Sequence, residues 1–258
     1  MSYLGYTKIV SKYLQAIKNP FILEIGVDKG QTSIPLIHNL VMTKNKFKWV
    51  GVDVRQDDCL VNQLTQMHGV SLFLNKGNEI NCNAVYNIAN SLDVLPVYEK
   101  RGTKFDLIMI DGDHNYATVS KELSYINDIC HESSWLLIDD YNGRWSTKDL
   151  FYKNRKSHKS NDLLEKNQVN EEKAGVKAAV DDWLANQTDW TLLDNGYDCV
   201  IAHKKHVSVS IRPGSTPHLM DATLLMASAH SNTRFDEQYR NLLNNGNALK
   251  IIEQKKQK

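Results

Sequence analysis

The sequence predicts an α/β fold, a doubly wound and mostly parallel seven-stranded sheet with helices on both faces. Apolar segments rich in β-forming residues alternate with helical stretches, a pattern typical of parallel strands joined by right-handed crossovers. Strands such as Phe105–Ile110 are almost continuously apolar, which indicates burial on both faces of the sheet. Near the end, two apolar runs flank Asn195-Gly196, a turn sequence typical of an antiparallel hairpin.

The first elements follow from these patterns in chain order. Residues Tyr6 to Ile17 place apolar side chains on one face of an N-terminal helix, which ends at Asn19-Pro20. Five parallel strands are then expected at Phe21–Ile25, Lys48–Val54, Val70–Leu74, Phe105–Ile110 and Ser134–Ile138. Helices are expected between them, around Thr32–Val41, Asp57–Met67, Asn83–Ser91 and Thr118–His131.

The second half of the chain changes in character after the fifth strand. Residues 143–172 are polar and long for a simple connection, which favours a lid or a disordered loop inserted in the domain. An amphipathic helix over Gly175–Leu184 and the hairpin strands Trp190–Leu193 and Tyr197–His203 follow. We therefore expect an N-terminal helix at 1–20, an α/β domain at 21–204 and a C-terminal extension at 205–258.

The composition of the 258 residues is ordinary for a globular protein, with 41% hydrophobic residues, 24% charged residues and a net charge of +1. Such a charge gives no long-range attraction for nucleic acid. No apolar run is long enough to span a bilayer, and no signal peptide is recognisable, so we expect a soluble, cytoplasmic protein without a membrane partner. The four cysteines lack the close spacing of a zinc or redox motif.

The glycine spacing after the first strand restricts the class of cofactor. A strand–glycine–helix unit is how open α/β sheets bind the ribose end of a nucleotide-like cofactor. A dinucleotide fingerprint needs glycines at its first, third and sixth positions, but counted from Gly26 these later positions hold Asp28 and Gln31. The P-loop pattern is absent as well. The motif present in this chain is Glu-x-Gly-x-x-x-Gly, from Glu24 to Gly30.

Two acidic residues have the positions of cofactor contacts. Asp53 ends the second strand, where a carboxylate can accept hydrogen bonds from both ribose hydroxyls. Its alternative role is that of a helix N-cap. Glu24 ends the first strand, where its carboxylate would stabilise a bound positive charge or simply be solvated in the loop.

Further acidic residues follow the fourth and fifth strands, as Asp111-Gly-Asp113-His114 and Asp139-Asp140. If these strands are neighbours, their ends lie ~5 Å apart at the edge where open α/β sheets bind ligands. Carboxylates that close repel one another unless a cation lies among them, and Mg²⁺ prefers such oxygen ligands. Without a metal, Asp111, Asp139 and Asp140 would act as caps, and His114 would be an ordinary loop histidine.

The glycine motif, Asp53 and the final hairpin together resemble class I S-adenosylmethionine-dependent methyltransferases over Phe21 to about His203. That family has a Rossmann-like sheet. The resemblance implies that Asn78, after the third strand, contacts adenine, although Gly77-Asn78 also reads as a plain turn. The cofactor contacts that it implies are Glu24, Gly26, Gly30, Thr32, Asp53, Asn78 and Asp111.

The pairing of Asp-Gly-Asp-x-x-Tyr with Ile-Asp-Asp-Tyr is similar to the macrocin O-methyltransferase-like group, metal-dependent enzymes that act on sugar hydroxyls of antibiotics. This resemblance implies that Asp111, Asp139 and Asp140 hold Mg²⁺ or another divalent cation, and that Asp113 is the general base. The sequence Asp-Gly-Asp-His also resembles a broader methyltransferase family in which His114 is a competing base.

The expected function is a Mg²⁺-assisted transfer of a methyl group to a hydroxyl of a small molecule. One alternative is a catalytically degenerate methyltransferase fold that only binds. Another is a metal-free methyltransferase with a protein or nucleic-acid acceptor, although the near-neutral charge argues against nucleic acid. The C-terminal extension, with an amphipathic stretch at 235–252, is the candidate surface for a homo-oligomer.

Overall fold

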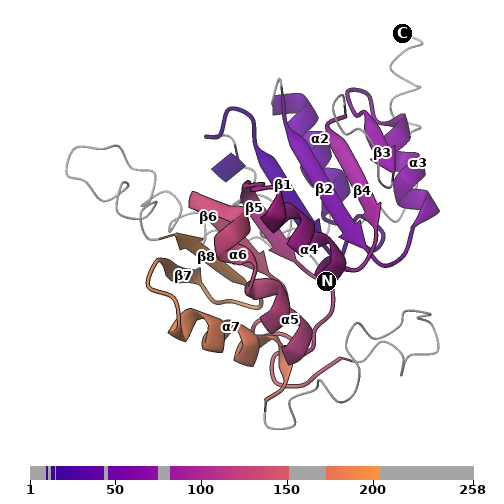
Figure 1. Ribbon diagram of the computed structural model, residues 1–258. Helices are drawn as coiled ribbons and strands as arrows, with labels where there is room; N and C mark the ends of the chain where they lie inside the picture. The colour runs from indigo at the N-terminus through magenta and orange to yellow at the C-terminus, as the bar shows by residue number, and fades with distance from the viewer. Residues whose placement is uncertain are drawn as a thin grey trace, which may run out of the picture.

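A single sheet of eight strands forms the centre of the described structure, a computed structural model (Figure 1). The structure describes residues 10, 13–14, 16–43, 46–74, 82–150 and 173–203. The strands are β1 (Phe21–Ile25), β2 (Lys48–Asp53), β3 (Leu72–Leu74), β4 (Ala84–Ile88), β5 (Phe105–Ile110), β6 (Cys130–Ile138), β7 (Trp190–Asp194) and β8 (Cys199–His203).

The strand order is β3-β4-β2-β1-β5-β6-β8-β7. All neighbours from β3 to β6 are parallel, whereas β8 is antiparallel to both β6 and β7. The predicted class, a doubly wound parallel sheet that ends in an antiparallel hairpin, is therefore confirmed. Most of the predicted N-terminal helix, Asn78, residues 151–172 of the predicted lid and the C-terminal extension lie outside the described residues.

Helices cover both faces of the sheet (Figure 1). On one face lie α2 (Ser33–Thr43) and α3 (Asp58–Gln66), together with the buried side chains of residues 10, 13 and 14. On the other face lie α4 (Ser91–Lys100), α5 (Tyr116–Leu123), α6 (Ile126–Ile129) and α7 (Gly175–Ala185). None of the helices in the described part of the chain is long and apolar enough to cross a membrane.

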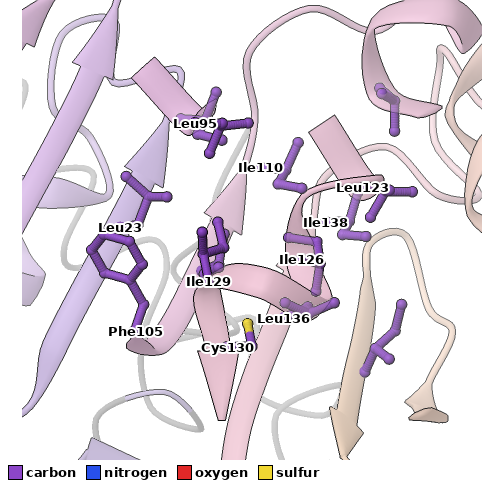
Figure 2. Close-up of a cluster of buried hydrophobic side chains, with 14 of the residues drawn as sticks. Leu23, Leu95, Phe105, Ile110, Leu123, Ile126, Ile129, Cys130, Leu136 and Ile138 are labelled. Carbon is purple, nitrogen blue, oxygen red and sulfur yellow. The ribbon is translucent and has the colours of Figure 1, made fainter. Parts of the chain in front are cut away.

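Each face of the sheet has its own apolar layer. Side chains alternate along β5, so that Ile108 and Ile110 enter one layer while Leu107 and Met109 enter the other. Figure 2 shows the first layer, where strand residues such as Ile110 meet side chains of α4, α5 and α6. Because β5 is buried on both faces, its sequence is apolar at nearly every position.

The predicted helix over Asn83–Ser91 is wrong, because β4 occupies Ala84–Ile88 in parallel register with β2. Its Ala-Val-Tyr-Asn-Ile sequence contains β-forming residues, and its first three positions are buried. The helix in this region is α4, which begins only at Ser91 and contains Pro96. The sheet therefore has eight strands where seven were predicted, and β4, rather than β3, is the neighbour of β2.

Backbone hydrogen bonds continue the parallel ladders just beyond the ends of the strands. Gly26 donates its N–H to the carbonyl of Val52 at 2.9 Å, and Asp111 donates to Ile25 at 2.8 Å. Asp139 donates in the same way to the end of β5, at 3.0 Å. The first loop residues after β1, β5 and β6 are thus fixed side by side at the carboxyl edge of the sheet.

Candidate active site

The loop after β1 depends on its two glycines. Gly26 has φ +83° and Gly30 has φ +74°, a left-handed conformation that glycine adopts without a steric penalty. A Cβ on Gly26 would collide with the backbone of Asp111, so the loops after β1 and β5 cross at this point. Thr32 follows, half-buried, just before α2. The close packing against Asp111 therefore requires a glycine at position 26, independently of the predicted approach of a cofactor.

Asp53 connects the end of β2 to this glycine loop. Its Oδ2 accepts the N–H groups of Val27 at 3.0 Å and Asp28 at 2.8 Å, and its Oδ1 accepts the N–H of Arg55 at 3.0 Å. The N-cap of the following helix, α3, is Asp57, so Asp53 does not have that alternative role. The half-buried carboxylate lies at the carboxyl edge, and its contact with a ribose stays a prediction.

Glu24 lies deeper than the prediction assumed. The residue is 3% exposed, and its Oε2 accepts hydrogen bonds from Ser33 Oγ and Trp49 Nε1, both at 2.8 Å. Burial raises its pKa to about 7 against the effect of these two donors. These contacts join β1 to α2 and β2, and a contact of Glu24 with the cofactor stays a prediction.

Asn90 is a candidate cofactor residue that the sequence reasoning missed. Ala89, at the end of β4, donates its N–H to the carbonyl of Asp53 at 2.9 Å, which places the next residue beside the predicted ribose site. The Asn90 side chain accepts the N–H of Leu92 at 2.9 Å and so caps α4. Its amide also has N–H donors for the edge of a base. Since β3 is not adjacent to β2, Asn90 has the position that the sequence reasoning gave to Asn78.

The acidic residues predicted after the fourth and fifth strands are close together. The two strands, β5 and β6, are neighbours with Ile110 opposite Ile138. His114 Nε2 lies 3.2 Å from Asp139 Oδ2 and 3.4 Å from Asp111 Oδ1. One ligand atom from each of these three residues lies within 4.8 Å of the others, a spacing that suits a metal ion. We call the carboxylates of Asp111, Asp139 and Asp140 the acidic rim.

Asp140 joins the acidic rim from an unusual backbone conformation, with φ 60°. Its Oδ1 accepts the N–H of Arg144 at 2.9 Å, and a Cβ on Gly143 would collide with the same oxygen. Its Oδ2 is buried, lies 3.7 Å from His114 Nε2 and has no hydrogen-bond partner among the described residues. A buried oxygen without a hydrogen bond is costly unless a cation lies nearby.

His114 supplies the positive charge of the acidic rim. Burial alone would lower its pKa, but hydrogen bonds and charge interactions with Asp111 and Asp139 raise it to about 10. For the carboxyl group of Asp139, burial alone would raise the pKa, but hydrogen bonds from His114 and Asp198 lower it to about 2. The pKa of Asp111 is raised by burial and by the charge of Asp139. At neutral pH the cluster therefore pairs a protonated imidazole with Asp139.

Asp198 is a further acid in this cluster that sequence reasoning missed. It is 4% exposed and lies just before β8, where its Oδ1 accepts the N–H of Asp140 at 3.2 Å. Burial and a hydrogen bond with Asp139 raise its pKa to about 9, so it is a protonated donor at neutral pH. The only sequence signal was an acid beside a hairpin turn. The antiparallel return of β8 along β6, with Cys199 opposite Ile138, brings it to the rim.

Asp113, the other base candidate, is held by the start of α5. Its Oδ2 accepts hydrogen bonds from the Thr118 hydroxyl at 2.7 Å and from the Asn115 amide. The residue is 7% exposed. Of the two base candidates, only His114 is shown by the described contacts to reach the carboxylates of the acidic rim.

Two tyrosines that follow the acidic motifs attach them to α7. Tyr116 OH donates to Asp182 Oδ2 at 2.7 Å, and Tyr141 OH donates to Asp181 Oδ1 at 2.5 Å. Lys177 Nζ lies 2.8 Å from Tyr141 OH and 2.7 Å from Asp181 Oδ2. Each tyrosine thus connects one motif to the same helix.

Comparison with known proteins gives the following matches. Residues 23–141 match a family model described as a methyltransferase domain. The O-methyltransferase TomG of Streptomyces achromogenes, solved with S-adenosylmethionine, is 16% identical, with 76% of this chain and 77% of that chain covered and a TM-score of 0.49. A Bacillus cereus O-methyltransferase in complex with S-adenosylhomocysteine is also 16% identical, with 78% of this chain and 80% of that chain covered and a TM-score of 0.49. No curated protein matches the chain.

An open α/β sheet with a glycine loop and an acid at its carboxyl edge, closed by an antiparallel hairpin, defines the class I methyltransferase fold. The matched residues run from β1 to Tyr141 and contain both the glycine loop and the whole acidic rim. Residues 23–141 therefore match a methyltransferase domain, and the sheet has the fold that the motifs predicted.

Proposed function

We propose that this protein transfers the methyl group of S-adenosylmethionine to a hydroxyl oxygen of a small molecule, with Mg²⁺ or another divalent cation held at the acidic rim. The observation that carries the proposal is the convergence of Asp111, Asp139, Asp140 and His114 beside the glycine loop. The net charge of +1 does not suggest a nucleic-acid acceptor.

The residues of the acidic rim fit a divalent cation. Asp111 follows β5 and Asp139 and Asp140 follow the neighbouring β6, so that three aspartates offer hard oxygen ligands. The buried Asp140 Oδ2 has no hydrogen bond in the described part of the chain. Asp111, Asp139 and Asp140 would hold the ion, and the hydrogen bond from Asp198 would orient Asp139. Bound there, a divalent cation would lower the pKa of the acceptor hydroxyl and orient its oxygen.

The residues around the glycine loop fit the methyl donor. Asp53 and Asn90 lie at the ends of neighbouring strands, and Gly26 brings the loop after β1 against Asp111. These residues would bind the adenosine part and direct the sulfonium methyl toward the rim. Because the transfer is a direct displacement, alignment and the exclusion of water account for much of the rate.

The acceptor proton has two possible destinations in this site. His114 is close to the rim, but its raised pKa keeps it protonated at neutral pH in the arrangement described, so it must first lose that proton. Asp113 already accepts two hydrogen bonds at one oxygen. We favour His114 because Nε2 is the atom that lies among the carboxylates.

A metal-free transfer is the second candidate, and one observation favours it. The imidazolium of His114 already balances part of the negative charge of the acidic rim. The carboxylates are therefore not left without a cation even when no metal is bound. Exhaustive chelation separates the two candidates, since full activity in chelator would exclude the metal mechanism.

The Asp139→Asn variant tests the role of the acidic rim. We expect it to abolish methyl transfer and to change the affinity for S-adenosylhomocysteine little, because the cofactor rests on β1, β2 and β4. The measurement is a one-methyl mass shift in a metabolite pool incubated with cofactor and Mg²⁺, together with calorimetry. Asp128→Asn, which neutralises an exposed acid of α6, is the matched control and should keep full activity. Full activity of Asp139→Asn would contradict the proposal.

The base is identified by comparing His114→Gln with Asp113→Asn. If His114 is the base, the first variant should lose the acidic limb of the pH–rate profile together with roughly 10²–10⁴-fold in rate. Asp113→Asn should then keep that limb with a smaller loss, due to a disturbed start of α5. The reverse pattern would assign the role to Asp113.

A further inference from the structure

Asp149 connects the first residues of two helices. Its Oδ1 accepts the backbone N–H of Tyr116, where α5 begins, and that of Gly175, where α7 begins, each at 2.8 Å. The first N–H groups of a helix have no partner within the helix, and a carboxylate there also interacts favourably with the helix dipole. Asp149 provides both effects for two helices at once.

The start of α7 has no side-chain cap of its own. Its N-cap residue, Ala174, makes no side-chain hydrogen bond. The N–H groups of Val176 and Lys177 donate to the carbonyls of Trp145 and Ser146, at 3.0 and 3.1 Å. Gly175 has φ +83°, and a Cβ there would collide with the Ser146 carbonyl. The segment from 145 to 149 therefore caps α7, and it begins only five residues after Asp140.

The start of α5 is equally close to the acidic rim. Tyr116 comes two residues after His114, so the N–H that Asp149 accepts is separated from His114 by one residue, Asn115. Helices α5 and α7 pack side by side (Figure 1). The hydroxyl of Tyr116 reaches Asp182 of α7 at 2.7 Å, a second connection between the same two helices.

We propose that Asp149 is a positioning residue that fixes His114 against the acidic rim through the start of α5. The inference rests on the proposed function, since it names what holds the proposed metal and base site in place. Asp149 acts through a backbone N–H and has no contact with His114 itself. When it is removed, the loop from Asp111 to Tyr116 loses its backbone attachment to the start of α7 and keeps the hydrogen bond of the Tyr116 hydroxyl to Asp182. The glycine loop, which is bonded to Asp53, keeps its contacts.

The experiment compares Asp149→Ala and Asp149→Asn with the wild-type protein. Mn²⁺ binding is followed by electron paramagnetic resonance in the presence of S-adenosylhomocysteine. The pKa of His114 is followed by NMR, with His114→Gln to assign the signal. We expect Asp149→Ala to weaken Mn²⁺ binding by roughly 10-fold or more, a typical effect of removing an outer-shell partner. Asp149→Asn should show an intermediate loss, because a neutral oxygen accepts more weakly than a carboxylate.

A matched control distinguishes positioning from the general loss of a helix cap. Asp57→Ala removes the side chain that caps α3 and should lower stability while leaving Mn²⁺ affinity and the His114 pKa unchanged. Affinity for S-adenosylhomocysteine, measured by calorimetry, should be the same in both Asp149 variants as in the wild type. Loss of that affinity together with Mn²⁺ binding would mean that the whole site collapses and would contradict a positioning role.

The outcomes separate this inference from the proposed function. A wild-type protein that binds no Mn²⁺ would contradict the metal site, and the His114 pKa would then decide the role of Asp149. A fall of that pKa by about one unit in Asp149→Ala supports the inference, because the imidazole would have left its carboxylates. If folded Asp149→Ala keeps the wild-type Mn²⁺ affinity and the wild-type His114 pKa, the positioning role of Asp149 is overturned. If Asp149→Ala does not fold, the same two criteria apply to Asp149→Asn.

Discussion

Glu122 is a fully buried carboxyl group on α5. Ser91 Oγ donates to its Oε1 at 2.6 Å, and its Oε2 has no partner in the part of the chain that the structure describes. Burial, with a smaller contribution from the charge of Asp113, raises its pKa to about 8 from 4.5. The folded protein therefore keeps a proton that the unfolded chain releases at much lower pH.

This difference predicts a pH dependence of stability. Between about pH 4.5 and 8 the folded state binds the extra proton, so the contribution of Glu122 to the free energy of unfolding falls as the pH rises. The neutral Glu122→Gln variant should not show this fall. From about pH 5 to 9, the stability difference should shift in favour of the variant by on the order of 3 kcal/mol.

Chemical denaturation of both proteins at several pH values measures that shift. Glu99→Gln is the control, because it removes the charge of an exposed carboxylate on α4 and leaves the core unchanged. A stability difference between Glu122→Gln and the wild type that is constant with pH would contradict the assignment of the buried proton.

At the scale of the elements, the start of α4 joins stability to cofactor binding. Asn90 caps the helix through the Leu92 N–H and follows β4, the neighbour of β2. We expect Asn90→Ala to destabilise the protein by about 1 kcal/mol and to weaken S-adenosylhomocysteine binding. Asn90→Asp keeps the cap and should retain wild-type stability. Denaturant unfolding and calorimetry provide the two measurements, and equal affinity in all three proteins would remove Asn90 from the cofactor site.

The elements differ in how well sequence patterns predict them. β5 and the final hairpin were predicted within a residue or two, because burial on both faces and the Asn195-Gly196 turn leave strong signals. The sequence wrongly predicts a helix at β4, since five residues of mixed polarity have no clear period. Its true identity depends on pairing with β2, a long-range contact that local sequence does not encode.

At the scale of the whole molecule, the predictable part of the site is the part that parallel strands bring together. Asp111, Asp139 and Asp140 were expected at one rim because neighbouring parallel strands end at the same edge. Asp198 was not, because it reaches the rim only when the hairpin returns antiparallel to β6. Asp149 was missed for a similar reason, since its two hydrogen bonds join segments 33 and 26 residues away.

The topology also predicts what the C-terminal extension does not do. β8 ends at His203 and is paired on both sides, with β6 and with β7, so a chain that ends shortly after this strand opens no new edge in the sheet. We therefore expect a protein truncated after residue 206 to unfold cooperatively and to keep its affinity for S-adenosylhomocysteine.

Light scattering then tests the proposed role of the extension in association. A lower mass per particle for the truncated protein than for the full chain, with unchanged cofactor affinity, would place the extension in an interface between copies. Equal masses would contradict association through the extension. A truncated protein that is folded by circular dichroism but binds no cofactor would show that the extension contributes to the site. Failure to fold would show that the extension completes the core, because the truncation leaves all strands of the described residues in place.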